Sequence, residues 1–538
     1  MMHPSPNGVT MNKRTMLPGI VSAILWGCMV GVLQGCGSSG STVSNPPPTL
    51  SLQTPSVTVT PASSSLTTAQ ILSVTVAVSG SSTTPAGSVT LSSGSYASFP
   101  ATLTNGSATV SIPAGLLAVG SDTLAAAYTP GTSSATEYNS ASGTVSVSVS
   151  AVSSTPTVTA TYATYPTDGA PFQAVASSNG LVFVGVSGSQ PGVQVFSPQN
   201  GVLAPTCLNV LSSSLIGEGA AVSDLSFLPN GTDLAAGIGS PGAIFFNLAA
   251  LETCTASGYV ISQGTIASDQ GTQEVVVTPD GKFAFVSNEY GVASGATTEG
   301  NIGIVSLQYD ANGNVTTGST LLGQISTGGT AIAGMTLSPD GTRLYVTSEI
   351  APTNNTAYGS SNPVLARTGC VQQTGGATNI NGLLTVINVA KAESALGSSA
   401  IVSTVDAGCS PVRMSETTDG STLWVAVRGD NRVLAFSTGA LEADPNNALL
   451  GYASTGGTAP VGIRLFHNQQ LLAVANSNRF DTGIANATIM YVAVPASASV
   501  VQTIPTGLFP REITVGSDDA TLYLVNYDSD TLEVISTQ

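Results

Sequence analysis

Charged and polar side chains recur at equivalent positions of a repeated sequence pattern. Counting back six residues from each of seven turn residues gives Gln173, Asp224, Glu274, Gly334, Arg413, Gly462 and Glu512. The next residue is apolar in every repeat, which fits a strand whose successive side chains point to opposite faces. We therefore expect three carboxylates and one guanidinium to face a common channel mouth, where they could bind a polar or charged ligand.

Arginines gather near the same positions. Six fall in loops or strand entries expected on one face: Arg367, Arg413, Arg428, Arg432, Arg479 and Arg511. Because guanidinium groups pair bidentately with carboxylates and phosphates, this clustering favours a small anionic ligand. The alternative is a set of loop-fixing salt bridges to Glu274, Glu349, Asp430 and Glu512. With Arg464, expected one layer deeper, the candidates for ligand binding are Gln173, Asp224, Glu274, Arg413, Arg428, Arg464, Arg511 and Glu512.

The elements that position these residues come from a repeat of about 50 residues. Segments such as TPDGKFAFVSNE, from Thr278, and SPDGTRLYVTSE, from Ser338, place Asp-Gly between two apolar runs, which is a strong hairpin signal. The turn residues are Asn179, Asn230, Asp280, Asp340, Asp419, Asn468 and Asp518. A third and usually a fourth apolar run follow each hairpin. Seven repeats of four strands predict an all-β fold with a seven-bladed β-propeller.

The last repeat stops after three strands, at LEVISTQ. The segment TPTVTATYATYPTDGAPFQ, from Thr155, has the form of the missing fourth strand. We therefore expect residues 157–165 to pair with residues 532–535, which would close a propeller of residues 155–538 and remove two open sheet edges.

Three segments carry a resemblance to a known family: LYVTS from Leu344, LWVAVRGDNRVLAFS from Leu423 and LYLVNYDSDTLEVIS from Leu522. They resemble the YVTN-type repeat of seven-bladed propellers grouped with bacterial lactonases. The resemblance implies a lactonase-like hydrolase of a lactone or sugar acid, with His, Glu and Arg around the channel. The only histidine after the first ten residues is His467, in a predicted hairpin turn on the opposite face, so the catalytic residues stay unknown.

The chain begins with a segment typical of export. Lys13 and Arg14 precede an apolar stretch, and LQGC resembles a bacterial lipobox, so residues 1–36 read as a lipoprotein signal peptide with Cys36 as the lipidated residue. The alternative is a single membrane-spanning anchor. Translation could start at Met1 or Met11. These features predict an exported protein of the bacterial cell envelope, periplasmic or surface-facing, attached to the membrane by a lipid at Cys36.

A polar, proline-ended linker of residues 37–49 precedes a block of short alternating strands at residues 50–152. The block carries only Asp122 and Glu137 as charges. Its run from PAGSVTL to SASGTVSV resembles a bacterial immunoglobulin-like repeat domain, which implies a β-sandwich that acts as a spacer or adhesive module.

Four cysteines remain beyond Cys36, an even number that suggests disulfides in an exported chain. Their places in the repeats predict the pairs Cys207–Cys254 and Cys370–Cys409, with buried free thiols as the alternative. No CxxC pair exists, so we expect no metal site, and nothing points to a cofactor. A formal net charge of −17 disfavours nucleic acid as a partner.

A long insertion, residues 350–381, separates the second and third strands of the fourth repeat. It is either a lid over the channel face or an excursion pinned by Cys370. Two functions remain open. One is a lipid-anchored envelope binding or scaffold protein, whose partner is a small anionic ligand, an envelope protein or a polysaccharide. The other is a lactonase-like hydrolase.

Overall fold

The computed structural model describes residues 52–94, 96–98, 100–151, 157–211, 221–239, 242–254, 270–290, 299–316, 318–352, 355–367, 370–371, 378–379, 381–394, 397–479 and 485–538. The proposed signal peptide, Cys36 and the linker lie outside these residues. Within the described ranges, no helix is both long enough and apolar enough to cross a membrane. In the described residues the fold is all-β, with short helices in the connections.

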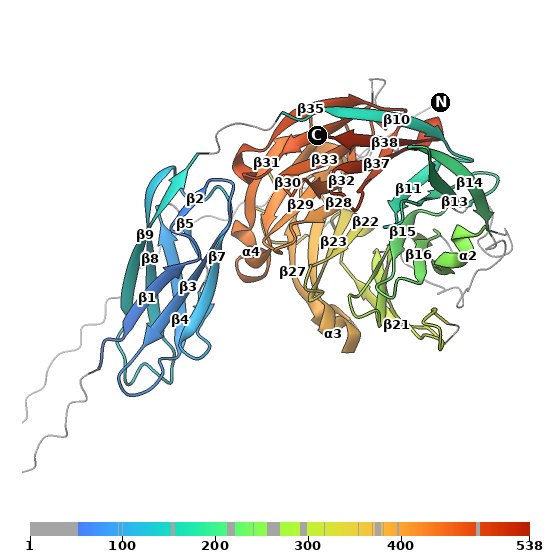
Figure 1. Cartoon of the computed structure of the whole chain (residues 1–538). Coiled ribbons are helices and arrows are strands. Elements are labelled where there is room, and N and C mark those ends of the chain that lie inside the picture. Colours follow the sequence, from blue (N-terminus) through green and yellow to red (C-terminus); the bar gives the residue numbers. More distant parts are fainter. Residues whose placement is uncertain are drawn as a thin grey trace, which may run out of the picture. The chain divides into compact units, whose positions relative to one another are not determined.

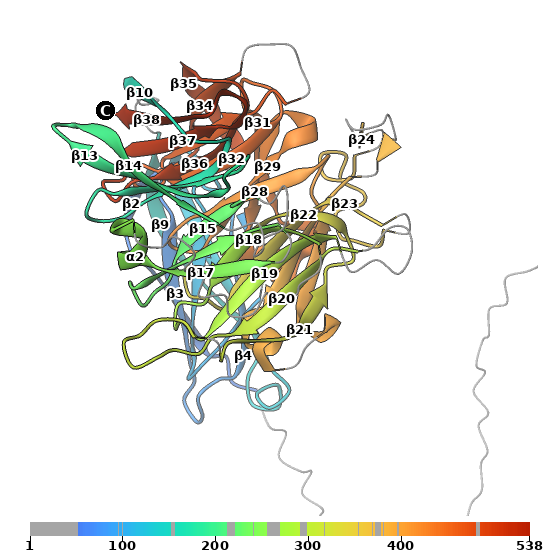
Figure 2. The ribbon, with the colours of Figure 1, turned by 90° about the vertical axis from the view of Figure 1, so that its right-hand side faces the viewer.

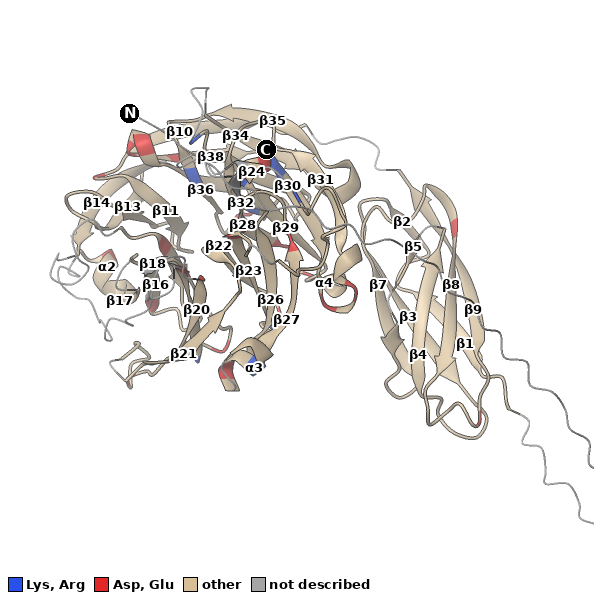
Figure 3. Ribbon diagram, turned by 180° about the vertical axis from the view of Figure 1, so that it is seen from behind, with Lys and Arg blue, Asp and Glu red and all other residues tan. Residues whose placement is uncertain are grey.

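The first described residues form two sheets around one hydrophobic core (Figure 1). The first sheet has the order β1 (Ser56–Pro61), β3 (Leu72–Ser79), β7 (Ser107–Ile112). The second runs β2 (Ser65–Thr67), β9 (Ala141–Ser150), β8 (Gly120–Pro130), β4 (Gly87–Ser93), β5 (Tyr96–Ala97), with β6 (Ala101–Thr102) also paired to β4. Strict alternation of buried and exposed residues along β3 gives the sheet one core face and one polar face. Charged residues are almost absent from these strands (Figure 3).

The remaining strands form antiparallel sheets of neighbours in sequence. The first three sheets are β11 (Pro171–Ala176), β12 (Val182–Val186), β13 (Gly192–Gln199), β14 (Val202–Val210); β15 (Asp224–Phe227), β16 (Asp233–Gly237), β17 (Ala243–Asn247); and β18 (Gln270–Val277), β19 (Phe283–Tyr290), β20 (Asn301–Ser306), β21 (Thr320–Ser326). The next are β22 (Thr330–Leu337), β23 (Arg343–Ile350), β26 (Leu383–Asn388), β27 (Ile401–Asp406); β28 (Pro411–Glu416), β29 (Thr422–Val427), β30 (Arg432–Ser437), β31 (Leu449–Ser454); and β32 (Pro460–Phe466), β33 (Leu471–Asn476), β34 (Asn486–Tyr491), β35 (Ser499–Pro505).

Short elements lie in the connections between these strands. They are the helices α2 (Leu248–Glu252), α3 (Val389–Ser394) and α4 (Thr438–Ala443), the 3₁₀ turns η1 (Ser398–Ala400), η2 (Arg428–Asp430), η3 (Pro445–Asn447), η4 (Pro495–Ser497) and η5 (Tyr527–Ser529), and the small hairpin of β24 (Cys370–Val371) and β25 (Thr378–Asn379).

The inner strands of the sheets follow one another around an axis. Contacts run from β11 through β15, β18, β22, β28 and β32 to β36 (Pro510–Val515), and β36 in turn contacts β11 (Figure 2). Hydrophobic clusters join neighbouring sheets, as where Phe183 of β12 packs in one cluster with Leu234 of β16. Four-stranded antiparallel sheets repeated about an axis make a β-propeller.

The predicted strand pairing between the two ends of this part is confirmed. β10 (Ala160–Pro166) pairs antiparallel with β38 (Thr531–Thr537), so that Tyr162 faces Ile535 and Tyr165 faces Leu532 (Figure 1). The sheet then continues through β37 (Thr521–Asn526) to β36. A strand from before the first repeat therefore completes the last sheet and leaves no open edge on β38.

Both predicted disulfides are confirmed, Cys207–Cys254 and Cys370–Cys409. They indicate an oxidising, extracytoplasmic location. The described part of the long insertion lies against the outer strand β27, where Tyr358 N donates to Thr404 O over 2.9 Å and Asp406 N donates to Tyr358 O over 2.8 Å. Backbone pairing and the Cys370–Cys409 disulfide thus hold the described part of the insertion beside β27, and Arg432 Nη2 of the next sheet donates to Val364 O over 3.1 Å.

Candidate functional site

The polar residues of the inner strands connect each strand to the next. Gln173 Oε1 accepts a hydrogen bond from Leu225 N, and Asp224 Oδ2 accepts one from Val275 N over 2.8 Å. Glu274 Oε2 accepts from Met335 N in the same way. Neighbouring inner strands belong to different sheets, so a buried backbone N–H on one strand needs a side-chain acceptor from the other.

Glycine occupies two of these positions because the next strand fills the space of a side chain. A Cβ atom on Gly334 would lie 2.3 Å from Val412 O, and one on Gly462 would lie 2.8 Å from Glu512 Cα. Both clashes are with backbone, which cannot move aside without shifting a strand. The repeat therefore uses either a hydrogen-bonding side chain or direct backbone approach at this position.

Arg413 forms the centre of a buried ion cluster. Its Nε lies 2.6 Å from Glu274 Oε1 and 3.0 Å from Glu512 Oε2, and its Nη1 donates to Ala333 O over 2.5 Å. The three side chains are only 9%, 11% and 4% exposed. Burial alone would lower the pKa of Arg413, but Glu274 and Glu512 raise it. These distances match the salt-bridge alternative that the sequence left open.

Two carboxyl groups in this cluster resist ionisation. Burial raises the pKa of Glu274 to about 7, helped by Asp224 and Glu512 and opposed by Arg413. Burial likewise raises the pKa of Asp224 to about 6, against the Val275 N–H and Arg413. The guanidinium of Arg413 is the nearest positive charge to three acids, Asp224, Glu274 and Glu512. Protonation of Asp224 and Glu274 would reduce the excess of negative charge in this cluster.

The other predicted arginines are placed as follows. Arg428 pairs with Glu349, and Arg367 and Arg432 both pair with Asp430, with contacts of 3.1 and 2.8 Å. Arg464 Nη1 donates to Met414 O over 3.3 Å, between neighbouring inner strands. Of the eight predicted ligand-binding residues, only Arg413, Arg428 and Arg511 line the cavity described next.

A cavity of about 280 Å³ lies just outside the ion cluster. Its described lining contains four guanidinium groups, two carboxylates and three aromatic rings: Arg413, Arg428, Arg479, Arg511, Glu289, Glu349, Phe172, Phe509 and Tyr527. Gln273, Ile332, Ala333, Val412 and Val461 complete it. Such a concentration of arginines in one hollow of a strongly acidic chain makes it the candidate site.

Arg511 is the most exceptional member of this lining. Its guanidinium lies over the Phe172 ring, 4.3 Å from the centroid, and Nη2 reaches Gln273 Oε1 at 3.4 Å. Its Nε is buried and has no hydrogen-bond partner among the described residues. Burial, together with Arg413 and Arg479, lowers the pKa of Arg511 to about 9. A buried donor beside like charges is a position that an anion would stabilise.

In six of the seven inner strands the residue before the predicted ring position lines the cavity, and in β28 the ring residue Arg413 lines it as well. The cavity is lined by Phe172, Gln273, Ala333, Val412, Val461 and Arg511, each immediately before a predicted ring position. The pairing register shifts at this point in β11, β18, β22, β28, β32 and β36. A β-bulge redirects a side chain, which strict alternation does not foresee. β15 has no shift, and its corresponding residue, Ser223, bonds Thr272 O instead.

The aromatic rings of the cavity were not predicted as site residues. Tyr527 contacts Phe172 and Phe509 edge-on, with centroids 5.1 and 5.3 Å apart. The Arg479 guanidinium lies 5.5 Å from the Phe509 centroid. The signal in the sequence was the pair of strand entries APFQ and FPRE, in which proline occupies corresponding places of the first and last repeats, followed by Phe172 in one and preceded by Phe509 in the other.

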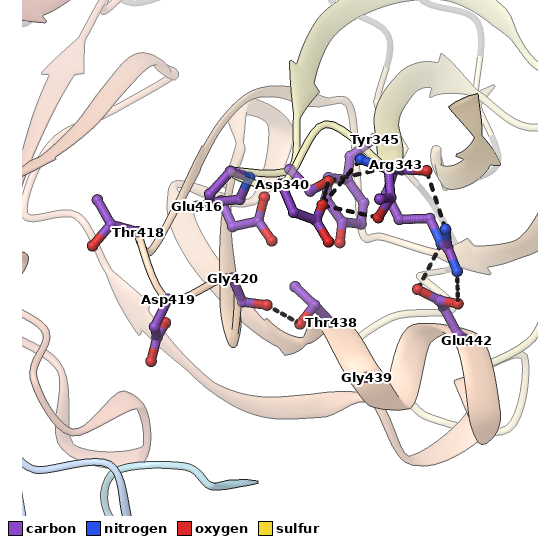
Figure 4. Close-up of a pocket in the computed structure, with 13 residues that line it drawn as sticks. Asp340, Arg343, Tyr345, Glu416, Thr418, Asp419, Gly420, Thr438, Gly439 and Glu442 are labelled. Carbon is purple, nitrogen blue, oxygen red and sulfur yellow. Dashed lines mark hydrogen bonds and ion pairs between the residues drawn. The ribbon is translucent and has the colours of Figure 1, made fainter. Parts of the chain in front are cut away.

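A second cavity of about 280 Å³ lies between the hairpins that join β22 to β23 and β28 to β29 (Figure 4). Arg343 and Glu442 form a two-point ion pair there, at 2.6 and 2.7 Å. Glu416 points into this cavity, and burial, together with Asp340 and Asp419, raises its pKa to about 8 although the Tyr345 hydroxyl opposes the shift. The sequence predicted Asp340 and Asp419 as turn residues, but no residue of this cavity as a site residue.

His467, predicted to be a turn residue, lies in the turn between β32 and β33. Its Nε2 is 2.8 Å from Thr537 Oγ1, and it lines neither cavity. Within the described residues, no group of three or more His, Cys, Asp or Glu side chains is arranged to hold a metal ion.

Comparison with known proteins gives matches in structure only. No family model and no curated protein matches the sequence. The chain is similar to a solved structure of Kuenenia stuttgartiensis hydrazine synthase, with 15% identity, a TM-score of 0.45, and 69% of this chain and 97% of that chain covered. It is also similar to the Cps50 (Swd1) β-propeller domain of Myceliophteria thermophila, with 10% identity, a TM-score of 0.44, and coverage of 69% and 96%.

Proposed function

We propose that the protein is an exported binding protein that holds a small anionic ligand in the cavity around Arg511. The observation that carries this proposal is the buried Arg511 Nε, which has no partner among the described residues and lies beside Arg413 and Arg479. Holding a cation in this place costs free energy, which a bound anion would recover through charge-assisted hydrogen bonds.

The setting of the site is part of the same proposal. The sheets would be seven blades of one YVTN-type, lactonase-like propeller, and the N-terminal sheets would be an immunoglobulin-like spacer. A lipid on Cys36 would attach the chain to the membrane of the bacterial cell envelope. The two disulfides agree with a site outside the cytoplasm.

Binding is favoured over lactone hydrolysis by the state of the candidate bases. Glu274 and Glu512 are engaged by Arg413, and Glu274 also accepts from Met335 N. Neither lines the cavity. Of the two carboxylates that do, Glu349 pairs with Arg428, and Glu289 accepts a hydrogen bond from Gln273 Nε2. The described residues that line the cavity also include no histidine.

Thermal denaturation of the purified protein with small oxyanions tests the proposal. At constant ionic strength, acetate, benzoate or phosphate should raise the Tm of the wild type, because a ligand that binds only the native state stabilises it. Arg511→Met should remove this rise. The matched control Arg343→Met, which removes an arginine paired with Glu442 outside the cavity, should keep it. The proposal fails if no oxyanion raises the Tm, or if Arg511→Met responds like the wild type.

A further inference from the structure

We infer that the ligand of this cavity carries an apolar body, about the size of one ring, beside its anionic group. The inference rests on the proposed function and adds the chemical class of the ligand, whichever anionic group it bears. It depends on the aromatic rings next to Arg511, on the backbone conformation of Phe509, and on the size and lining of the cavity.

Aromatic rings form a continuous wall that begins at Arg511. The Arg511 guanidinium lies over the Phe172 ring, and Tyr527 contacts both Phe172 and Phe509 edge-on. Arg479 lies beside the last of these rings, 5.5 Å from the Phe509 centroid. All five side chains line the cavity. An anion held by Arg511 would therefore place the rest of its molecule against this wall, where an apolar group is favoured over water.

Phe509 has a backbone conformation that small residues have in other repeats. Three residues before the ring position, φ is positive at the start of five inner strands. The residues are Gly271, Ala331, Ser410, Ala459 and Phe509, with φ of 81°, 58°, 52°, 50° and 52°. Positive φ is unfavourable for a bulky side chain, and such conformations cluster at ligand sites. Phe509 is the one large residue of these five, and its ring lines the cavity.

Hydrogen bonds from the η5 turn hold this part of the chain without using the ring. Tyr527 N donates to Phe509 O over 2.9 Å, and Asp528 N donates to Leu508 O over 3.2 Å. Leu508 N donates to Ser529 Oγ over 2.6 Å. Because the bonds to Phe509 and Leu508 use their backbone atoms, an alanine at position 509 could keep the same conformation. A contact with the ligand would explain why a phenyl ring stands there.

The cavity holds more than an anionic head group. Its volume is about 280 Å³. An apolar cavity of about 150 Å³ is enough for a benzene molecule. Ile332, Ala333, Val412 and Val461 add aliphatic surface to the aromatic wall. Water beside such surface has few hydrogen-bond partners, so its displacement by an apolar group is favourable.

Two pairs of probes share a head group and differ in a ring: acetate with benzoate, and inorganic phosphate with phenyl phosphate. Calorimetric titration of the purified protein compares the members of each pair at fixed pH and ionic strength. In each pair that binds, we expect the ring-bearing member to bind at least about tenfold more tightly. Phe509→Ala should reduce this advantage to below about threefold and leave the affinity for the smaller member nearly unchanged.

A matched variant controls for the loss of an aromatic ring. Phe509→Ala places alanine at a φ that Ala331 and Ala459 already have. Tyr452→Ala also removes a ring 5.5 Å from an arginine, Arg432, but Tyr452 lines neither cavity. Tyr452→Ala should therefore keep the full advantage of the ring-bearing probes. Circular dichroism of both variants, checked against the wild type, shows whether they are folded.

The outcomes separate this inference from the proposal on which it rests. If both members of a pair bind equally tightly and Arg511→Met abolishes their binding, the cavity holds anions but the apolar body is wrong. If a folded Phe509→Ala keeps the advantage of the ring, the inference is also overturned. Should this variant not fold, the wild-type ratios alone decide. If neutral benzamide binds as tightly as benzoate, or if no probe binds and no oxyanion raises the Tm, the proposed function itself fails.

Discussion

Glu274 Oε1 lies 2.6 Å from Arg413 Nε, and both side chains are about nine-tenths buried. With Glu512 on the other side of the guanidinium, the central charges of the inner strands satisfy one another. The ion cluster is therefore the floor of the candidate site, and the ligand-facing groups belong to the layer above it.

Removing the central cation should destabilise the fold strongly. Arg413→Met leaves Glu274 and Glu512 buried without their counter-ion, and breaking a buried pair in this way costs about 3–5 kcal/mol. Urea denaturation at neutral pH measures the change in the free energy of unfolding. Arg343→Met, in a partly exposed pair, should cost below about 1 kcal/mol. Equal effects of the two variants would contradict the structural role given to Arg413.

Glu416 should make stability depend on pH. Burial raises its pKa from 4.5 to about 8, so between these values the native state holds a proton that the unfolded state has lost. The contribution of Glu416 to stability is therefore complete below about pH 4.5 and falls as pH rises toward 8. Glu416→Gln should unfold at similar urea concentrations to the wild type at pH 5 but at higher concentrations at pH 8. A variant that is equally stable, or less stable, at pH 8 would refute the buried, neutral state of this carboxyl group.

The strands and their pairing could be predicted from sequence because the same hairpin pattern recurs in every repeat. Turn residues between alternating apolar runs predicted the hairpins. The last repeat has only three strands, which predicted that β10 pairs with β38. The site was harder to predict. Of the predicted ring positions Arg413 lines the cavity, but at the β-bulges the preceding residue lines it instead, Arg511 before Glu512 and Phe172 before Gln173. Proline stands two residues before the ring position in four of these strands, at Pro171, Pro411, Pro460 and Pro510, but a prediction from strict alternation makes no use of that mark.

The glycines of the ring should not tolerate a methyl group. Gly334→Ala would place Cβ 2.3 Å from Val412 O, and Gly462→Ala would place it 2.8 Å from Glu512 Cα, so each should lose about 1–3 kcal/mol through overpacking. Gly439, in α4, has open space around the same atom. Gly439→Ala should be neutral or stabilising by up to about 1 kcal/mol. Thermal and urea unfolding of the three variants check this order, and a neutral Gly334→Ala would contradict the close approach of β22 and β28.

Closure of the last sheet can be tested by cross-linking. Thr161 and Ser536 are exposed and directly opposite each other in the β10–β38 pairing. Thr161→Cys with Ser536→Cys should form a disulfide under mild oxidation, seen as a shift in non-reducing electrophoresis of the protein. The offset pair Ala163→Cys with Ser536→Cys should not cross-link efficiently, because two residues of offset exceed disulfide geometry. Equal cross-linking of both pairs would show a different register.

The most direct test of the account is a crystal structure with 4-bromobenzoate, whose bromine is located by anomalous scattering. The account predicts the carboxylate on Arg511, beside Phe172, with the Arg413–Glu274–Glu512 cluster intact beneath it. A carboxylate that displaces Glu274 from Arg413, or a ligand bound only elsewhere on the protein, would contradict it.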